Sequence, residues 1–214
     1  FSAEMERTLQ VLDYAILVIN GADGVQGHTM TLWKLLKSYQ VPVFIFVNKM
    51  DQPGTDKEKT LAELQKKLDV NCIDYNGQDK DCLYDTAAMC SETLMEEYLN
   101  TGKISDEAMN EAIGHRQIFP CLFGSALKME GVKELLAFMD AHMQCGEYPE
   151  EFGARVFKIV RDEQDNRLTY MKITGGSLKV KAMLTDYHEG MEPSECWQEK
   201  ADQIRLYSGG RNVA

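Results

Sequence analysis

Four consecutive residues, Asn48-Lys49-Met50-Asp51, carry side chains suited to recognising a guanine base. The Asp51 carboxylate can accept two hydrogen bonds, from the ring N–H and the exocyclic amine of guanine, a donor pair that adenine lacks. The stem of Lys49 can lie over the purine face, and the Asn48 amide can tie neighbouring loops together. As a bare pattern, N-K-x-D also fits a surface turn with a solvated Lys–Asp pair, so the neighbouring segments must decide.

A second segment, Gly124-Ser125-Ala126-Leu127-Lys128, offers complementary chemistry. Backbone N–H groups of a turn of small residues can meet the exocyclic oxygen that guanine has and adenine lacks. Taken alone, this segment also fits an ordinary turn between a strand and a helix, where Gly and Ser are common. Because both segments follow buried strands, in this order, the pair favours a guanine pocket over two unrelated turns.

Apolar runs predict the strands that position these segments. Val43 to Val47 ends at Asn48, and Ile118 to Phe123 ends at Gly124. A third run, Tyr14 to Ile19, predicts a strand that is buried on both faces. Strands that alternate with helices predict a parallel sheet with helices on both of its faces. Ligands bind at the carboxyl ends of the strands in such sheets, which is where both segments lie.

Helices are predicted where apolar residues recur every three or four positions. Residues 70–84 show no such pattern and are expected to be irregular. We expect the side chains of Trp33, Met89 and Met95 in the core. The predicted helices cover residues 1–12, Gly27 to Tyr39, Lys57 to Leu68, Asp85 to Leu99, Ser105 to His115 and Val132 to Met143.

The pattern changes from helical to alternating near residue 150. Ala154 to Val160 and Arg167 to Thr174 alternate with period two, and Gly175-Gly176 is a hairpin signal. We therefore predict two domains, an α/β domain over residues 1–148 and a β-rich domain over 149–214. The second holds too few strands to close a barrel.

Composition and the remaining polar residues exclude several functions. A net charge of −11 argues against tight nucleic-acid binding by this segment. No apolar run is long enough for a membrane helix, and the start of the chain has no signal-peptide pattern. Scattered cysteines and isolated histidines predict reduced thiols and structural or solvated imidazoles, in a cytoplasmic protein without a metal site or a membrane contact. These residues are Cys72, Cys82, Cys90, Cys121, Cys145, Cys196, His28, His115, His142 and His188.

Together these motifs resemble the translational GTPases of the elongation factor G superfamily, and most closely the tetracycline-resistance ribosomal protection branch. Phe1 to Asp13 resembles the helix after the family's D-T-P-G-H switch. Asn48 to Asp51 matches its guanine-specificity motif, and Gly124 to Ala126 matches its second base-contacting loop. Ala154 to Ile159 and Leu168 to Leu178 resemble the opening strands of its second, β-barrel domain.

The resemblance implies a P-loop-GTPase-like parallel sheet whose N-terminal part is missing, followed by an incomplete β-barrel domain. A short irregular stretch at 70–84 suggests a reduced subdomain insertion, which fits the protection branch better than the translocase. The implied ligand is GTP or GDP, with Mg²⁺ expected only in the full-length protein. The residues implied to bind the nucleotide are Asn48, Lys49, Asp51, Ser125, Ala126 and Leu127.

The departures from the family are equally informative. No G-x-x-x-x-G-K-[ST] phosphate-binding loop occurs in the sequence. Because the family's switch residues are expected before Phe1, we expect no catalytic residue here and no GTP hydrolysis by this chain alone. The predicted function is that of a GTPase, in the full-length protein, whose nucleotide state controls docking on the ribosome and the release of tetracycline. The alternatives are a housekeeping elongation factor G translocase and a non-hydrolysing guanine-nucleotide-binding or scaffold module.

Overall fold

The computed structural model of this chain consists of two compact units, Phe1–Gly146 and Glu147–Ala214. It describes residues 2–76, 79–144, 146–186, 192, 196–208 and 211–213, so that Cys145 and His188 lie outside the described residues. In the described residues, no helix has both the length and the apolar character needed to cross a membrane.

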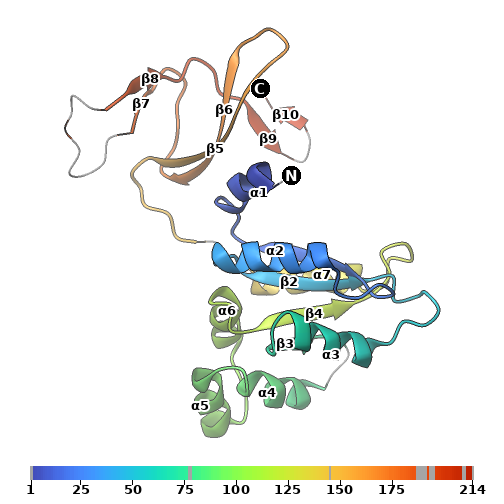
Figure 1. Cartoon of the computed structure of the whole chain (residues 1–214). Helices are drawn as coiled ribbons and strands as arrows, with labels where there is room; N and C mark the ends of the chain where they lie inside the picture. The colour runs from blue at the N-terminus through green and yellow to red at the C-terminus, as the bar shows by residue number, and fades with distance from the viewer. Residues whose placement is uncertain are drawn as a thin grey trace. The chain divides into compact units, whose positions relative to one another are not determined.

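A four-stranded parallel sheet forms the centre of the first unit (Figure 1). Its strands are β1 (Ala15–Asn20), β2 (Val43–Asn48), β3 (Cys72–Asp74) and β4 (Phe119–Phe123), in the order β1-β2-β4-β3. Since all three pairings are parallel, the carboxyl ends of the strands share one edge of the sheet. The predicted ligand-binding segments follow β2 and β4, which are neighbours.

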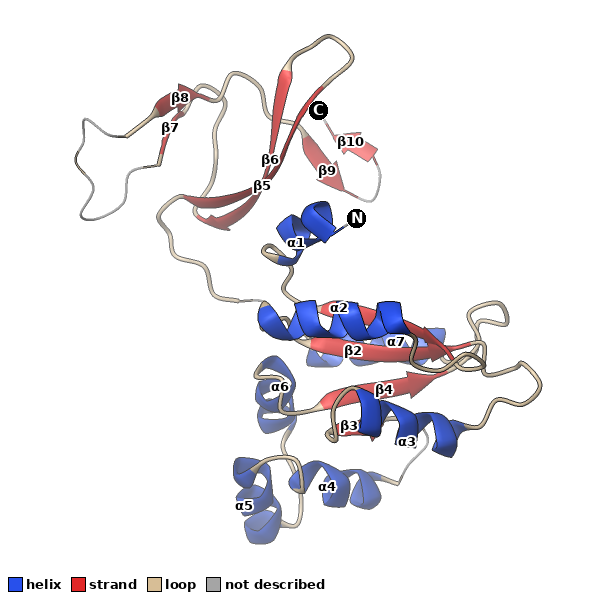
Figure 2. Cartoon of the chain, viewed as in Figure 1, coloured by secondary structure: helices blue, strands red, loops and turns tan. Residues whose placement is uncertain are grey.

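Helices cover both faces of this sheet (Figure 2). One face packs in a core with Trp33, Leu36 and Leu64. The other face packs with Ile113 and Phe138, among others. The helices are α1 (Ser2–Leu9), α2 (Gly27–Ser38), α3 (Lys57–Lys67), α4 (Lys80–Ala88), α5 (Glu92–Thr101), α6 (Asp106–Gly114) and α7 (Val132–His142).

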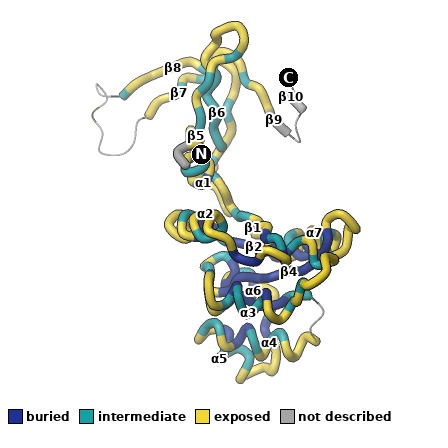
Figure 3. Tube along the Cα trace, turned by 45° about the vertical axis from the view of Figure 1, so that its right-hand side comes forward, coloured by how far each residue is buried: buried dark blue, intermediate teal, exposed yellow. Residues whose placement is uncertain are grey.

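β1 differs from its prediction because one of its faces is open. All of β2 up to Val47 is buried, as Figure 3 shows for the central strands. In β1, however, Ile16 and Val18 are 41% and 59% exposed. Side chains two residues apart lie on the same face of a strand, so one face of this edge strand is largely exposed. The prediction of burial on both faces is therefore wrong for β1.

The segment between α3 and α6 is more regular than predicted. Residues 72–74 form β3, whose three residues are too few to give a periodic signal but pair with β4. The single helix predicted from Asp85 to Leu99 is in fact α4 and α5, separated near Ser91. Met89 lies at that break and is 81% exposed, so its predicted core position is wrong, whereas Trp33 is buried as predicted. α5 ends at Gly102, which adopts a left-handed backbone with φ 71°.

The second unit consists of antiparallel pairs. β5 (Gly153–Arg161) pairs with β6 (Arg167–Gly175), and two pairs of three-residue strands follow. These are β7 (Met183–Thr185) with β8 (Gln198–Lys200) and β9 (Leu206–Ser208) with β10 (Arg211–Val213). The predicted fold class, a parallel α/β sheet followed by antiparallel strands, is confirmed.

The hairpin turn of this unit lies at Asp162–Asn166 and not at Gly175-Gly176 as predicted. The Asp162 carboxylate accepts the N–H groups of Gln164 and Asn166, and this side-chain contact closes the turn in place of glycine. Gly175 instead ends β6, where an added Cβ would collide with the backbone of Glu151. The lack of space for a side chain, rather than a turn, explains the glycine there.

Candidate nucleotide-binding site

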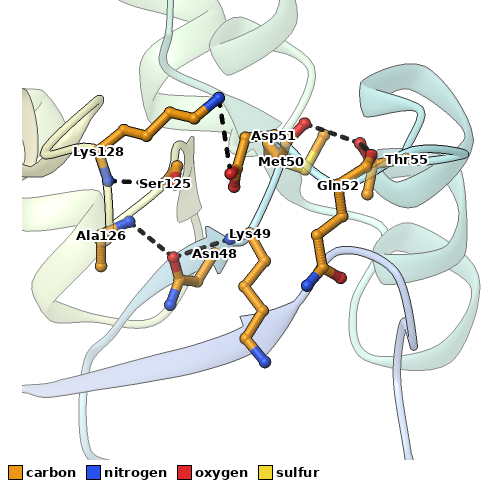
Figure 4. A network of polar contacts seen from close by, with 9 residues as sticks. All are labelled: Asn48, Lys49, Met50, Asp51, Gln52, Thr55, Ser125, Ala126 and Lys128. Atoms are coloured by element: carbon orange, nitrogen blue, oxygen red, sulfur yellow. Dashed lines mark hydrogen bonds and ion pairs between the residues drawn. The ribbon is translucent and has the colours of Figure 1, made fainter.

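The carboxyl ends of β2 and β4 bring the two predicted segments together. Val47 and Phe123 are partners in the parallel pairing, so the loops that follow start side by side. The Gly124 N–H donates to the Val47 carbonyl at 2.9 Å, and the Met50 N–H donates to the Gly124 carbonyl at 3.0 Å. Residues that are more than 70 positions apart in the sequence therefore form one site (Figure 4).

Asn48 ties the two loops together, as its side chain was predicted to do. Its Oδ1 accepts the Lys49 N–H at 2.8 Å and the Ala126 N–H at 2.9 Å. Lys49 adopts a left-handed backbone, with φ 64°, which is uncommon for a residue with a side chain. The bonds made by Asn48 hold that conformation, and the exposed Lys49 side chain extends away from the Asn48 amide (Figure 4).

Asp51 faces the turn that follows β4. A hydrogen bond with the Ser125 side chain is the main cause that holds the pKa of the Asp51 carboxyl below its ordinary value. The Lys128 Nζ, 3.6 Å from Asp51 Oδ2, lowers that pKa further. The Asp51 side chain is 17% exposed. It is therefore an ionised group that only accepts hydrogen bonds at neutral pH, as recognition of two guanine donors requires.

Lys128 is a site residue to which sequence reasoning gave no role. The signal that could have revealed it is its position three residues after Ser125, in a turn already expected to face Asp51. Its own N–H donates to Ser125 Oγ at 3.4 Å, so Lys128 contacts both partners of the pair. The Lys128 side chain is 54% exposed and can move aside when a ligand approaches Asp51.

The three turn residues predicted to offer N–H groups differ in what those groups do. Ser125 is buried, and its N–H donates to the Glu130 carbonyl at 2.9 Å. The Ala126 N–H is taken by Asn48. Among the described residues, only the Leu127 N–H of these three meets no acceptor, and Leu127 is 91% exposed. The turn therefore presents one N–H to a ligand and uses the other two to hold its shape.

Other residues with reactive side chains have structural surroundings. His142 is buried, with its Nδ1 2.6 Å from Asn110 Oδ1 and its Nε2 3.5 Å from the Tyr75 hydroxyl. Cys72 and Cys121 are free thiols in the core. In the part of the chain that the structure describes, no three His, Cys, Asp or Glu side chains are grouped to hold a metal ion.

A parallel sheet covered on both faces, with polar loops gathered at the carboxyl ends of adjacent strands, defines a ligand-binding α/β domain. Residues 1–145 match the Elongation factor Tu GTP binding domain family, and the chain belongs to that family. The predicted relationship to translational GTPases of the elongation factor G superfamily is confirmed by this match and by the relatives.

Three relatives illustrate the range of this similarity. Ribosome-releasing factor 2, mitochondrial, of Drosophila ananassae is 26% identical over 96% of this chain and 36% of its own length. Tetracycline resistance protein TetO of Streptococcus mutans is 29% identical over 86% of this chain and 32% of its own length. Elongation factor G of Ureaplasma urealyticum serovar 10 is 28% identical over 83% of this chain and 36% of its own length. The chain thus spans about a third of the length of these relatives.

A solved structure from Thermus thermophilus has a similar fold. It aligns with 100% of this chain and with 38% of its own chain, with a TM-score of 0.74. The two sequences are 19% identical in this alignment, so the similarity supports the fold alone.

Proposed function

We propose that this chain binds GTP or GDP through the guanine base and is part of a ribosome-associated translational GTPase. The observation that carries the proposal is the ionised Asp51 carboxylate, which faces Ser125 and Lys128 in the same turn whose Leu127 N–H meets no acceptor among the described residues. The carboxylate accepts from the ring N–H and the exocyclic amine, while the Leu127 N–H donates to the exocyclic oxygen. Adenine offers neither the donor pair nor the oxygen.

The remaining site residues support this recognition in distinct ways. The Asn48 amide fixes the distance between the two loops by accepting the Ala126 N–H. The Lys49 stem covers one face of the base, because the left-handed backbone at Lys49 directs its exposed side chain out of the loop. The Ser125 side chain keeps the Asp51 carboxylate charged and oriented. Removal of the Asn48 amide or of the Ser125 hydroxyl is therefore expected to weaken nucleotide binding, although neither group contacts the base directly.

We infer that residues outside this chain bind the phosphates of the nucleotide and hydrolyse GTP. The sequence has no phosphate-binding loop, and the described residues include no cluster fit to hold a metal ion. Contacts to the triphosphate normally supply much of the affinity for a nucleotide. The chain alone is therefore expected to bind the base weakly and to leave GTP intact. Mg²⁺ is expected to bind only in the full-length protein.

The lengths of the alignments favour the ribosomal protection branch. The alignments with ribosome-releasing factor 2 and elongation factor G extend over 267 and 246 residues, more than the 214 of this chain. Those relatives therefore carry residues within the matched region that this chain lacks. The alignment with TetO extends over 201 residues. This difference agrees with a reduced insertion, and the translocase remains the second candidate.

Base recognition is tested by titrating the 214-residue chain with GDP and with ADP while following its backbone amides by NMR. We expect GDP to shift the amide signals of Lys49, Asp51 and Leu127, and ADP to leave them in place. Equal shifts with both nucleotides, or shifts elsewhere only, would contradict the proposed site. The amide of Lys103, in the α5–α6 connection, serves as an internal control and is expected to stay unchanged.

The ribosomal part of the proposal requires the complete reading frame. A phosphate-binding loop encoded before residue 1 supports the GTPase, whereas its absence from the complete protein favours the scaffold alternative. Expression of the complete gene in a tetracycline-sensitive host separates the two GTPase candidates. Growth at otherwise inhibitory tetracycline supports ribosomal protection, and rescue of a translocation defect without tetracycline resistance supports the translocase.

A further inference from the structure

The last rung of the β3–β4 pairing is made by a side chain. On the side of β4 that faces β3, the Cys121 carbonyl accepts the Tyr75 N–H at 2.9 Å. Two residues further on, Phe123 meets the amide of Asn76 instead of backbone. Asn76 Oδ1 accepts the Phe123 N–H at 3.0 Å, and Asn76 Nδ2 donates to the Phe123 carbonyl at 3.3 Å. A single amide thus satisfies both backbone groups of the final residue of β4.

The backbone of Asn76 is itself held by an ion pair. The Asn76 N–H donates to Asp74 Oδ1 at 3.0 Å, and the Asn76 carbonyl accepts Lys57 Nζ at 2.7 Å. Lys57 Nζ also lies 2.6 Å from Asp74 Oδ2, and the Asp74 side chain is 8% exposed. The same ammonium lies 5.2 Å from the centre of the Phe123 ring. We call Lys57, Asp74 and Asn76 the β4 clamp.

We propose that the β4 clamp positions the base-binding turn, an inference that rests on the proposed function. Phe123 is the residue directly before Gly124, where the turn begins. Without the side-chain amide of Asn76, the Phe123 N–H and carbonyl lose the partners that they have on the β3 side of β4. The end of β4 is then held less tightly. The turn would carry Ser125 away from Asp51 and move the Leu127 N–H, so both halves of base recognition depend on a residue that touches no ligand.

The chain offers a matched control for this residue at the other end of β3. Asn71 Nδ2 donates to the Gln117 carbonyl at 2.8 Å, and the Asn71 N–H donates to Asp69 Oδ1 at 3.1 Å. Like Asn76, Asn71 donates from its side chain to a backbone carbonyl and has its own N–H bound by an Asp carboxylate, but it lies before β3 and β4 begin. Asn71→Ala removes a comparable interaction at the edge of the sheet opposite to the nucleotide site.

The experiment compares Asn76→Ala with Asn71→Ala in the 214-residue chain. Amide hydrogen exchange is measured without nucleotide, and GDP binding is measured by NMR titration. We expect Asn76→Ala to raise the exchange rates of the Phe123 and Ala126 amides about tenfold and to weaken GDP binding about tenfold. Asn71→Ala is expected to change neither by more than about twofold, even if both variants lower the melting temperature equally.

Each outcome decides a separate question. Unchanged exchange at Phe123 and Ala126 in Asn76→Ala, or equal effects of both variants, would overturn the clamp. Faster exchange with unaltered GDP affinity would show that the clamp holds β4 without serving the site. If the unsubstituted chain binds no GDP, the proposed function fails, while the exchange rates still test the clamp. If Asn76→Ala does not fold, Lys57→Gln takes its place, with an expected increase at Phe123 of about threefold.

Discussion

The Asp51 carboxylate contacts two donors of its own chain, the Ser125 side chain and the Lys128 ammonium. Ser125 is buried and its backbone is fixed, whereas the Lys128 side chain is half exposed and its ammonium group lies 3.6 Å from the Asp51 carboxylate. In the complex that we propose, a guanine base that approaches this carboxylate replaces Lys128 and leaves Ser125 in place. The carboxylate is therefore ionised and oriented before binding, and the exchange of one cation contact for two base donors requires little reorganisation.

Base selectivity is the prediction that follows for Asp51. In Asp51→Asn, an amide can donate where the carboxylate accepts, and xanthine offers an acceptor where guanine offers an amine. We expect the preference for GDP over xanthosine diphosphate to fall by about tenfold or more, since a hydrogen bond to a charged group contributes about 1.5–3 kcal/mol. Titration calorimetry measures it. Asp56→Asn, which preserves the cap of α3, should leave the preference unchanged, and an unchanged preference in Asp51→Asn would refute the assignment.

A second prediction concerns pH and His142. Burial lowers the pKa of the His142 imidazole, and Asp106 opposes this shift in part. Because the folded chain holds the proton less tightly than the unfolded chain, stability is complete above the unfolded pKa of about 6.5 and falls as the pH drops below it. We expect His142→Gln to reduce the difference in urea midpoint between about pH 7.5 and about pH 5.5. His115→Gln, at an exposed residue, should retain the full difference in urea midpoint. If His142→Gln also retains it, the pH dependence of stability does not arise from the buried His142 imidazole.

At the scale of elements, the turn after β4 depends on two glycines. A Cβ at Gly124 would collide with the Glu130 carbonyl, and a Cβ at Gly131 would lie 2.6 Å from the Phe123 carbonyl. Gly131 also has a left-handed backbone, with φ 75°. The two ends of the turn can therefore pass each other only without side chains, and this close approach forms the Ser125–Glu130 bridge.

Substitution of the first of these glycines tests that requirement. We expect Gly124→Ala to lower the free energy of unfolding by about 1–3 kcal/mol, as overpacking does, and to shift the Ala126 and Leu127 amide signals. Gly114→Ala is the control, because Gly114 lies in α6 with open space around it, and alanine there is expected to be neutral or stabilising. Urea unfolding of both variants measures the effect. If Gly124→Ala has the same free energy of unfolding as the unsubstituted chain, the turn accommodates the added methyl group without strain.

The elements that the sequence predicts well are those with long, uniform patterns. β2 and β4 are continuous apolar runs because both of their faces are buried, so their ends, and with them Asn48 and Gly124, could be located. β3 was missed because three residues give no period and its partner lies more than 40 positions further on in the chain. For the same reason, the role of the Asn76 side-chain amide emerges only from tertiary contacts. The tie made by Asn48 was predicted, but its partner, the Ala126 N–H, is likewise identified only by the structure.

At the scale of the whole molecule, the two units differ in how they bury apolar side chains. In the first, the central strands are buried on both faces between two cores. In the second, the described strands form separate two-stranded sheets, and Val156, Ile159 and Ile173 remain exposed on β5 and β6. Two-stranded sheets are marginally stable in water, because they bury too little apolar surface to offset the ordering of the chain.

Hydrogen exchange should therefore distinguish the two units. We expect the strand amides of β5 and β6 to exchange at least about tenfold faster than those of Ile16 to Val18 and Phe44 to Phe46. We also expect the 214-residue chain to associate through the strand edges of the second unit, which sedimentation at increasing concentration would detect. Equal protection in both units, with a monomer at every concentration, would show that the second unit is as well packed as the first.

Gly102, whose backbone is left-handed, marks a place where this chain can be labelled for imaging. It lies in the exposed connection between α5 and α6, with open space around it. α5 is drawn on the side of the sheet away from the carboxyl ends of β2 and β4 (Figures 1 and 2). Exposed loop tips of this kind accept whole guest domains. A fluorescent protein inserted after Gly102 would therefore label the molecule while leaving intact both loops that we propose to bind the base.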